Sequence, residues 1–358
     1  MSVAIERPTG IDELTTFLTF ADRVNERLEA YWPVFVPMNL PMLKGEGPAA
    51  AGKRLLPLVA KEKGAIVARV LAVVDEHHIT HWNEPLGHLA MFEAKPDTTD
   101  AVRALVNEAC GWLRSESMEA VRAGFGAGDF PFVIEESDVL PPVLMRQNPV
   151  YYHSLLKEAG FESERAWTDY KAPVTAELIK RWEGFLADAR ARGFEIVPLR
   201  DVDEARRVDD FNDTWNEAFE HHWGVVPTAR DEQADRLAML GPMGAFDTSV
   251  IAYRNDEAVG VCFVTPEIAS QIAVRRRDLR DDEKLNFLGI GVRESARRQG
   301  VNLAIAAYAY LELARRGASH VSYTLVLDDN WPSRRTAEKL GCRICANYMV
   351  YRRNFRAS

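Results

Sequence analysis

The sequence predicts an α/β protein in which a mixed sheet is flanked by helices, and it predicts this arrangement twice. Apolar strand-like segments alternate with helical patterns along the chain, which is typical of this fold class. The order of the elements in the first half matches the order in the second. At 358 residues the chain is also longer than one typical domain. We therefore expect two tandem units related by duplication.

The first unit is expected to cover residues 1–172. Its helices follow from amphipathic periodicity, and its last helix is closed by Gly160. A stretch rich in Pro and Gly predicts a long loop. The expected elements are strands at Val3–Arg7, Leu55–Lys61, Ala65–Asp75, Gly87–Ala94, Ala120–Gly124 and Trp167–Lys171, helices at Ile11–Trp32, Thr99–Ser117 and Tyr151–Ala159, and a loop at Pro33–Gly52.

The second unit is expected to cover residues 193–358, after a linker helix with charged faces at Ala176–Arg192 within residues 173–192. The turn residues Asn255 and Asp256 predict a hairpin. The expected elements are strands at Phe194–Pro198, Thr248–Tyr253, Ala258–Pro266, Leu285–Val292, Val321–Leu327 and Ile344–Arg352, and helices at Val202–His222, Gly300–Arg316 and Pro332–Leu340.

Composition excludes several classes of function. The net charge of -9 argues against a general nucleic-acid or membrane-surface binder, because such a protein needs a basic face. Four cysteines are too few for a disulfide framework, and the first residues lack the pattern of a signal peptide. No apolar run approaches the length of about 20 residues that spans a bilayer. We expect a cytoplasmic protein without nucleic-acid or membrane partners.

Residues 284–300 contain a local cluster of basic residues, although the chain as a whole is acidic. The strand Lys284–Val292 contains Gly289 and Gly291, and glycine within a strand often marks a close approach by another chain or a ligand. Arg297 and Arg298 follow it. Gly300 then opens a helix whose N-terminal amides and partial positive charge favour an anion. The sequence therefore predicts a phosphate-binding turn between this strand and this helix.

The same residues resemble a known family. The run RRQG at 297–300 is similar to the start of the (Q/R)-x-x-G-x-(G/A) signature with which GNAT acyltransferases hold the pyrophosphate of coenzyme A. The segment NWPSRRTAEKLGC at 330–342 is similar to the family's segment that contacts the pantetheine arm. The resemblance implies two tandem GNAT-like domains, each with a mixed, mostly antiparallel sheet flanked by helices, the first of them degenerate.

The resemblance also implies acetyl-CoA, or another acyl-CoA, as co-substrate. The residues expected to contact it are Ile290, Gly291, Val292, Arg297, Arg298, Gln299, Gly300, Val301, Asn302, Leu303, Asn330 and Ser333. A backbone N–H near Ile290 would polarise the thioester carbonyl. Two positions depart from the family pattern. Asn302 stands where Gly or Ala is usual, and Ala337 stands where many relatives carry a Tyr that protonates the leaving thiolate.

The acceptor side offers several candidate catalytic residues. Acylation of an amine needs a base, and Glu217 and His221 are four residues apart on one face of an expected helix. Asp328, at the end of a strand, is an alternative base. Tyr323 is a candidate replacement for the missing acid. For each of these residues a plain surface or structural role is the competing interpretation.

Other motifs are weaker. The cluster His77, His78, His81 and His88 is interpreted as part of a solvated polar loop after a strand, so we expect no metal site there. The first half carries Asp97 and Asp100 where a cofactor would need cations, so we expect no cofactor in that half.

The function that these patterns favour is acyl-CoA-dependent N-acyltransfer, with acetyl as the expected group, to a small-molecule or peptide amine by direct transfer. A non-catalytic ligand-binding or scaffold protein that keeps the coenzyme A fold is the alternative. A third hypothesis, transfer from an aminoacyl-tRNA donor, is disfavoured by the acidic balance and the intact arginine turn. The oligomeric state is left open, with a homodimer as one alternative.

Overall fold

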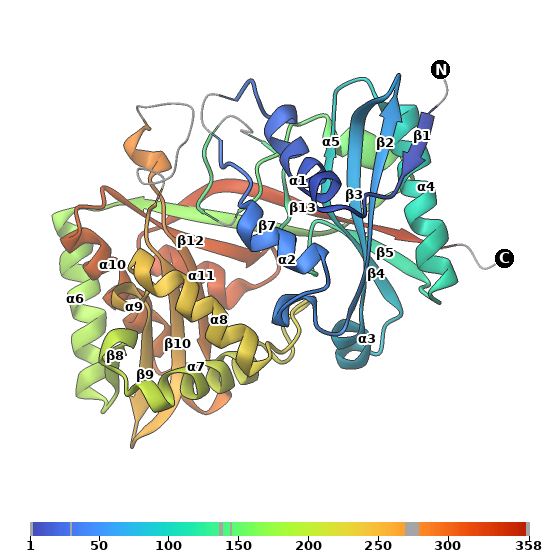
Figure 1. Ribbon diagram of the computed structural model, residues 1–358. Helices are drawn as coiled ribbons and strands as arrows, with labels where there is room; N and C mark the ends of the chain where they lie inside the picture. Colours follow the sequence, from blue (N-terminus) through green and yellow to red (C-terminus); the bar gives the residue numbers. More distant parts are fainter. Residues whose placement is uncertain (1–2, 29–30, 136–138, 144, 269–278, 356–358) are drawn as a thin grey trace.

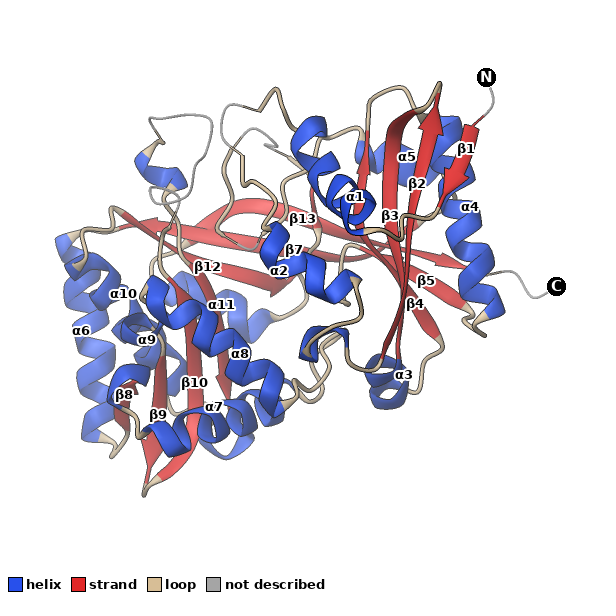
Figure 2. Cartoon of the chain, viewed as in Figure 1, coloured by secondary structure: helices blue, strands red, loops and turns tan. Residues whose placement is uncertain are grey.

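The computed structural model describes residues 3–28, 31–135, 139–143, 145–268 and 279–355. These residues form the predicted α/β protein, with a mixed, mostly antiparallel sheet of nine strands, a second sheet of four strands, and helices on their faces (Figure 1, Figure 2). Among the paired strands of the described part, β4 and β5 run parallel and the others run antiparallel.

The first half follows the expected order with one added helix in the loop and one before β4. Its elements are β1 (Val3–Glu6), α1 (Ile11–Val24), α2 (Val36–Leu43), η1 (Pro48–Ala50), β2 (Lys53–Glu62), β3 (Ala65–Asp75), α3 (Glu76–Trp82), β4 (Leu86–Ala94), α4 (Thr99–Ser115), β5 (Ala120–Ala123), β6 (Phe132–Val133), α5 (Tyr152–Glu158) and β7 (Glu162–Pro173).

The second half also follows the expected order, with two helices inserted before its hairpin. Its elements are α6 (Ala176–Ala191), β8 (Glu195–Pro198), η2 (Leu199–Asp201), α7 (Glu204–Phe219), α8 (Arg230–Leu240), η3 (Gly241–Met243), α9 (Ala245–Thr248), β9 (Val250–Arg254), β10 (Glu257–Thr265), η4 (Asp281–Glu283), β11 (Phe287–Val292), η5 (Glu294–Ala296), α10 (Val301–Arg315), β12 (His320–Leu327), α11 (Trp331–Lys339) and β13 (Arg343–Asn354).

The last strand of each half crosses into the sheet of the other half. β13 pairs with β5 on one side and with β7 on the other, and β7 in turn lies between β13 and β12. The path through the large sheet is therefore β1-β2-β3-β4-β5-β13-β7-β12. Figure 1 shows β7 and β13 as long strands that run from one half to the other. One continuous sheet thus joins the two halves.

The small sheet has the order β11-β10-β9-β8 and is buried on both faces. Successive side chains of β10 point to opposite faces. Val261 and Phe263 pack with residues of α7 and α8, whereas Cys262 and Val264 pack with α10. A two-sided burial of this kind explains why β10 reads as a nearly continuous apolar run. It also fixes α7 and α10 on opposite faces of the strands that carry the site.

The helix that connects the halves is part of the core. α6 was expected to be a linker element, but it buries Leu178, Trp182 and Leu186 in the same cluster as α10. The indole Nε1 of Trp182 donates to the carbonyl oxygen of Leu340 at 2.9 Å. Residue 341 is a glycine with φ +90°, and a Cβ there would meet the Leu178 side chain at 2.4 Å. The helix therefore fixes the end of α11.

Three local predictions were wrong. The helix expected to reach Trp32 ends at Val24, and the expected Pro33–Gly52 loop contains α2. Pro41 lies inside α2, and its presence hid the helix because proline usually breaks one. α8 was not predicted, since its sequence RDEQADRLAML has few apolar residues to reveal a period.

Candidate functional site

The predicted phosphate-binding turn leads directly into α10. Gly300 is the N-cap residue and has φ +81°, a conformation that favours glycine. The first intrahelical hydrogen bond runs from the Ala304 amide to the Gly300 carbonyl at 3.1 Å. The amides of the first three helical residues therefore have no acceptor within the helix, and the first turn carries no acidic residue. This end of α10 is suited to an anion.

Four guanidinium groups surround this turn. Arg192 donates to the carbonyl oxygen of Gln299 at 2.9 Å, and Arg254 donates to its side-chain oxygen at 2.8 Å. Arg297 is held by two backbone carbonyl oxygens, and Arg298 is exposed beside it. Within the described residues none of the four forms an ion pair with a carboxylate. Their charges add to the field of the helix N-terminus and are available to a polyanionic ligand.

β11 and β12 lie side by side but are joined only through side chains. The amide group of Asn286 donates to Ser322 O at 3.1 Å and accepts from Ser322 N at 2.8 Å. Further along, the hydroxyl of Thr324 accepts from Leu288 N at 3.0 Å and donates to Leu288 O at 2.6 Å. Beyond Thr324 no further bond joins the two strands in the described part of the chain. The two strands, which belong to different sheets, therefore separate after this point, and we call the opening between them the split.

The backbone of Ile290 faces this split. In an antiparallel pair every second residue bonds to the partner strand. Arg293 donates its N–H to Val259 O at 2.9 Å, which places the odd-numbered residues of β11 toward β10. Leu288 and Ile290 therefore point their polar groups away from β10. Thr324 satisfies those of Leu288, whereas the N–H and C=O of Ile290 have no partner among the described residues.

β12 has a bulge at the point where its contacts to β11 end. Leu325 has φ +52°, and the pairing of β12 with β7 shifts register between Tyr323 and Val326. The amide of Leu325 donates to Oδ1 of Asp169 on β7 at 2.6 Å. Oδ2 of Asp169 accepts from the hydroxyl of Tyr348 on β13 at 3.0 Å. A side chain from the first half thus closes the bulge that opens the split.

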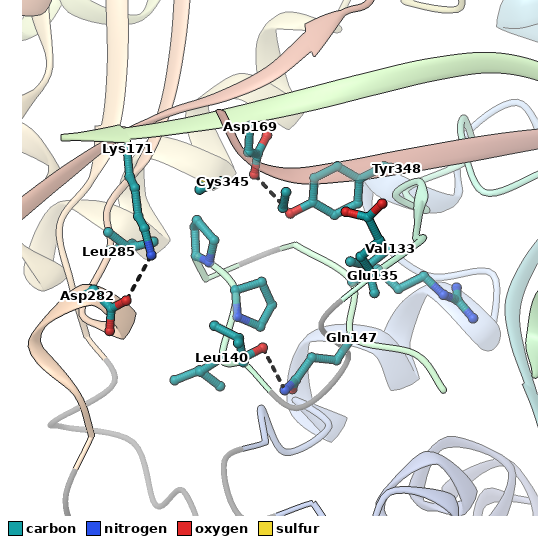
Figure 3. A pocket seen from close by; sticks show the side chains of 15 residues that line it. Val133, Glu135, Leu140, Gln147, Asp169, Lys171, Asp282, Leu285, Cys345 and Tyr348 are labelled. Carbon is teal, nitrogen blue, oxygen red and sulfur yellow. Dashed lines mark hydrogen bonds and ion pairs between the residues drawn. The ribbon is translucent and has the colours of Figure 1, made fainter. Parts of the chain in front are cut away.

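Asp169 is the main residue of the site that the sequence did not reveal. Its side chain is buried, and burial raises its pKa to about 7 although the Leu325 and Tyr348 hydrogen bonds oppose this shift. Figure 3 shows Asp169 and Tyr348 among the side chains that line a recess. The available signal was an acidic residue in the middle of a predicted strand.

α7 lies against β11 at the two strand glycines. A Cβ at Gly289 would meet the Trp215 ring at 2.7 Å, and a Cβ at Gly291 would meet Ala218 at 2.9 Å. The close approach that these glycines predicted is therefore made by a helix of the same chain. Glu217 on α7 lies 3.3 Å from Arg293, and the side chain of His221 is 92% exposed beyond the end of the helix.

The other candidate residues lie around the end of β12. Asp328 is exposed just after this strand. Asn330 accepts from the Ser333 amide at 3.2 Å and caps α11. Tyr323 is buried beneath α11, where it interacts with the Ser333 hydroxyl, and burial raises its pKa. The structure thus brings Tyr323, Asn330 and Ser333 together. Glu217 lies on α7, but α7 ends at Phe219, so the prediction that His221 shares a helical face with Glu217 was wrong.

The two departures from the family pattern have structural partners. The side-chain amide of Asn302 donates to the hydroxyl of Thr336 at 2.7 Å, so it links α10 to α11. Ala337 is completely buried, and its carbonyl accepts from the Cys342 amide at 2.9 Å at the helix end. No hydroxyl is present at this position of α11.

The corresponding place in the first half is closed by its own side chains. At the end of β4 the hydroxyl of Tyr152 accepts from Ala94 N at 3.0 Å, and that of Tyr151 donates to Ala94 O at 2.7 Å. Asp97 and Asp100 lie at the start of α4, as the sequence indicated. The turn thus carries negative charge, and the last backbone groups of the strand are already paired.

The described residues contain no group of three or more His, Cys, Asp or Glu side chains placed to hold a metal ion. The histidine cluster is not the expected solvated loop, because His77, His78 and His81 lie on α3 and His88 lies on β4. The rings of His78 and His88 are buried and pack edge to face with centroids 4.9 Å apart. In the same residues no helix combines the length and apolarity that crossing a membrane requires.

Comparisons with known proteins bear on this geometry. No protein-family model matches the sequence. Among curated proteins, the protein YghO of Escherichia coli (strain K12) is 25% identical over 194 residues, which are 51% of this chain and 48% of YghO. The match therefore covers about half of each protein.

Solved structures match over almost the whole chain. A GCN5-related glucosamine N-acetyltransferase region of a fungal multi-domain β-N-acetylglucosaminidase has a TM-score of 0.61 and 13% identity, with 98% of this chain and 38% of that one covered. A tandem GNAT protein from the clavulanic acid pathway has a TM-score of 0.59 and 11% identity, with both chains covered completely. A GCN5-related N-acetyltransferase from Sphaerobacter thermophilus has a TM-score of 0.55 and 13% identity over 99% of this chain and 96% of that one. The chain has the tandem GNAT fold.

Proposed function

We propose that this chain is an acyl-CoA-dependent N-acyltransferase that moves an acyl group, acetyl in the first instance, directly to the amine of a small molecule or peptide. One observation carries the proposal. The unpaired backbone groups of Ile290 face a split that ends beside the free amides of α10 and four guanidinium groups without carboxylate partners. Residues 193–358 would form the transferase unit, and residues 1–172 would support it.

The residues present fit the parts of acetyl-CoA. The amides at the start of α10, with Arg297 and Arg298, would hold the pyrophosphate. The C=O of Ile290 would pair with the arm within the split, and its N–H would stabilise negative charge on the thioester oxygen. In the transfer the acceptor nitrogen forms a C–N bond to the acyl carbon and loses a proton, while the C–S bond breaks and the thiolate takes up a proton.

The test is calorimetric titration of acetyl-CoA into the purified protein. We expect micromolar binding that weakens at least about tenfold in the Arg297→Ala/Arg298→Ala variant, because two charge-assisted contacts are lost. Arg103→Ala is the matched control, since Arg103 occupies the first turns of α4 in the other half and pairs with Asp100. Release of free thiol with a panel of primary amines then measures transfer. Absence of acetyl-CoA binding would refute the proposal.

A non-catalytic ligand-binding protein is the second candidate, and Ala337 favours it. This position is completely buried and has no hydroxyl with which to protonate a leaving thiolate. Under this alternative acetyl-CoA binds and depends on Arg297 and Arg298, but no amine releases thiol. The two assays together separate the candidates.

A further inference from the structure

We propose that Asp169, on the strand that the first half contributes, is a positioning residue that sets the split between β11 and β12 and so keeps Ile290 accessible to the acyl-CoA arm. The inference rests on the proposed function, because it names what shapes the cleft of that site. It assigns to the first half a direct part in the geometry of the second.

The argument starts from the place where β12 leaves β11. Thr324 makes the last contacts to β11, and the next residue, Leu325, has φ +52°. A left-handed conformation at a leucine is unfavourable and persists only where neighbouring groups hold it. Asp169 supplies such a group, because its Oδ1 lies 2.6 Å from the Leu325 amide.

Asp169 itself is fixed from the other side. Its Oδ2 accepts from Tyr348 on β13 at 3.0 Å, and both side chains are about 1% exposed. A buried carboxylate with two donors has one stable orientation, since any other would leave polar groups unpaired. β13 and β7 are the two exchanged strands, so the bulge depends on the exchange. Figure 3 shows this pair in the wall of the recess, with Lys171 and Asp282 paired separately beside it.

Without this acceptor the partly buried Leu325 amide would lose its partner. β12 would gain by straightening, and a straight β12 would lie closer to β11 beyond Thr324. Because the side-chain bridges of Asn286 and Thr324 end there, the N–H of Ile290 would then meet the β12 backbone directly, as adjacent paired strands do. Closing the split in this way removes the groups that the acyl-CoA arm needs.

The first experiment needs no ligand. Hydrogen exchange is measured at the amides of Ile290 and Leu325 in the wild type and in Asp169→Ala. In the wild type we expect fast exchange at the Ile290 amide and slow exchange at the Leu325 amide. In Asp169→Ala we expect exchange to become at least about tenfold slower at Ile290 and at least about tenfold faster at Leu325. Asp169→Asn keeps an oxygen for Leu325, so it should restore the wild-type pattern. An unchanged Ile290 amide in Asp169→Ala overturns the proposal, whether or not acetyl-CoA binds.

The second experiment separates positioning from stability. Acetyl-CoA is titrated into Asp169→Ala, Asp169→Asn and Leu156→Ala, the last of which removes buried side-chain volume from the first half's core. We expect the dissociation constant to rise at least about tenfold in Asp169→Ala alone. Equal affinity in Asp169→Ala and the wild type contradicts the positioning role. Lack of binding by the wild type refutes the proposed function instead, and the exchange experiment still decides the inference.

Discussion

The hydroxyl of Tyr152 accepts a hydrogen bond from the amide of Ala94 at 3.0 Å. Ala94 ends β4, as Val292 ends β11. In the first half a side chain therefore pairs a backbone amide at the end of the strand, whereas in the second half the backbone of Ile290, near the end of β11, has no partner among the described residues. The two halves share a fold but differ in the partners of the backbone groups at the end of this strand. In the first half these partners are tyrosine hydroxyls of the same chain.

Tyr152→Phe tests this difference. The substitution leaves the buried Ala94 amide unpaired and removes the hydroxyl that donates to Glu93 at 2.6 Å. We expect the free energy of unfolding to fall by about 1–3 kcal/mol in urea titrations, with no change in acetyl-CoA affinity. Tyr151→Phe, at a half-buried site, is the control and should cost less. A changed affinity in Tyr152→Phe would mean that the first half takes part in binding.

Asn286→Ala tests the junction of the two sheets. Asn286 is buried and makes reciprocal hydrogen bonds with the Ser322 backbone. Its loss leaves the buried N–H of Ser322 unpaired, whereas Ser322 O keeps the hydrogen bond from the Tyr310 hydroxyl. We expect a loss of about 2–3 kcal/mol in the free energy of unfolding. Asn216 makes the same kind of reciprocal pair with Thr228 at a less buried position and serves as the control. Equal losses in the two variants would contradict the explanation by burial.

The pH dependence of stability tests the burial of Asp169. Its pKa is raised from 3.8 to about 7, so the folded state binds an extra proton between these values. This contribution to stability is complete below pH 3.8 and is lost as the pH rises through 7. Asp169→Asn has no carboxyl group to ionise, so its stability does not include this loss as the pH rises. We therefore expect the variant to gain stability relative to the wild type as the pH rises from 5 to 9, by about 3 kcal/mol at most.

The control for this pH experiment is Asp282→Asn, because the hydrogen bond from Lys171 lowers the pKa of Asp282 and reverses the sign of its contribution. Asp282→Asn should show no gain in the free energy of unfolding over the wild type at pH 9. Stability curves that run parallel against pH in the wild type and in Asp169→Asn would contradict the raised pKa of Asp169.

The other titratable or charged groups that line the recess with Asp169 are Glu135, Arg146, Lys171, Asp282, Cys345 and Tyr348.

Gly289→Ala tests the contact between α7 and β11. A Cβ at this position would lie 2.7 Å from the Trp215 ring, so the helix must move away from the strand. We expect a loss of about 1–3 kcal/mol in the free energy of unfolding. Trp215→Leu creates space at the contact, so the double variant should recover part of the loss in a double-mutant cycle. Strictly additive effects would show that the clash is not the cause.

Much of this fold follows from local sequence patterns. The alternation of strands and helices, the glycines at 289 and 300 and the arginine pair at 297–298 each reflect a constraint between residues close in the sequence. These signals located β11, the turn and α10 correctly. α2 and α8 were missed because Pro41 breaks the expected helical pattern and because α8 shows little apolar periodicity.

The split itself depends on contacts that no local pattern records. Asp169 and Leu325 are 156 positions apart, and their contact exists because β7 lies beside β12. In the sequence Asp169 is one polar residue within a strand, which normally indicates a solvent-facing position. Its burial arises from strand exchange, and that depends on the pairing of the whole chain.

The crossing of β7 and β13 also constrains how the chain is made. Residues 343–354 are synthesised after the whole of the first half, yet they fill the place between β5 and β7 of that half. Until they arrive, two strand edges of that half are open to pairing with other chains. The first half therefore cannot complete its sheet until residues 343–354 have been synthesised, and a chain cut before Arg343 loses the completed form of both halves at once.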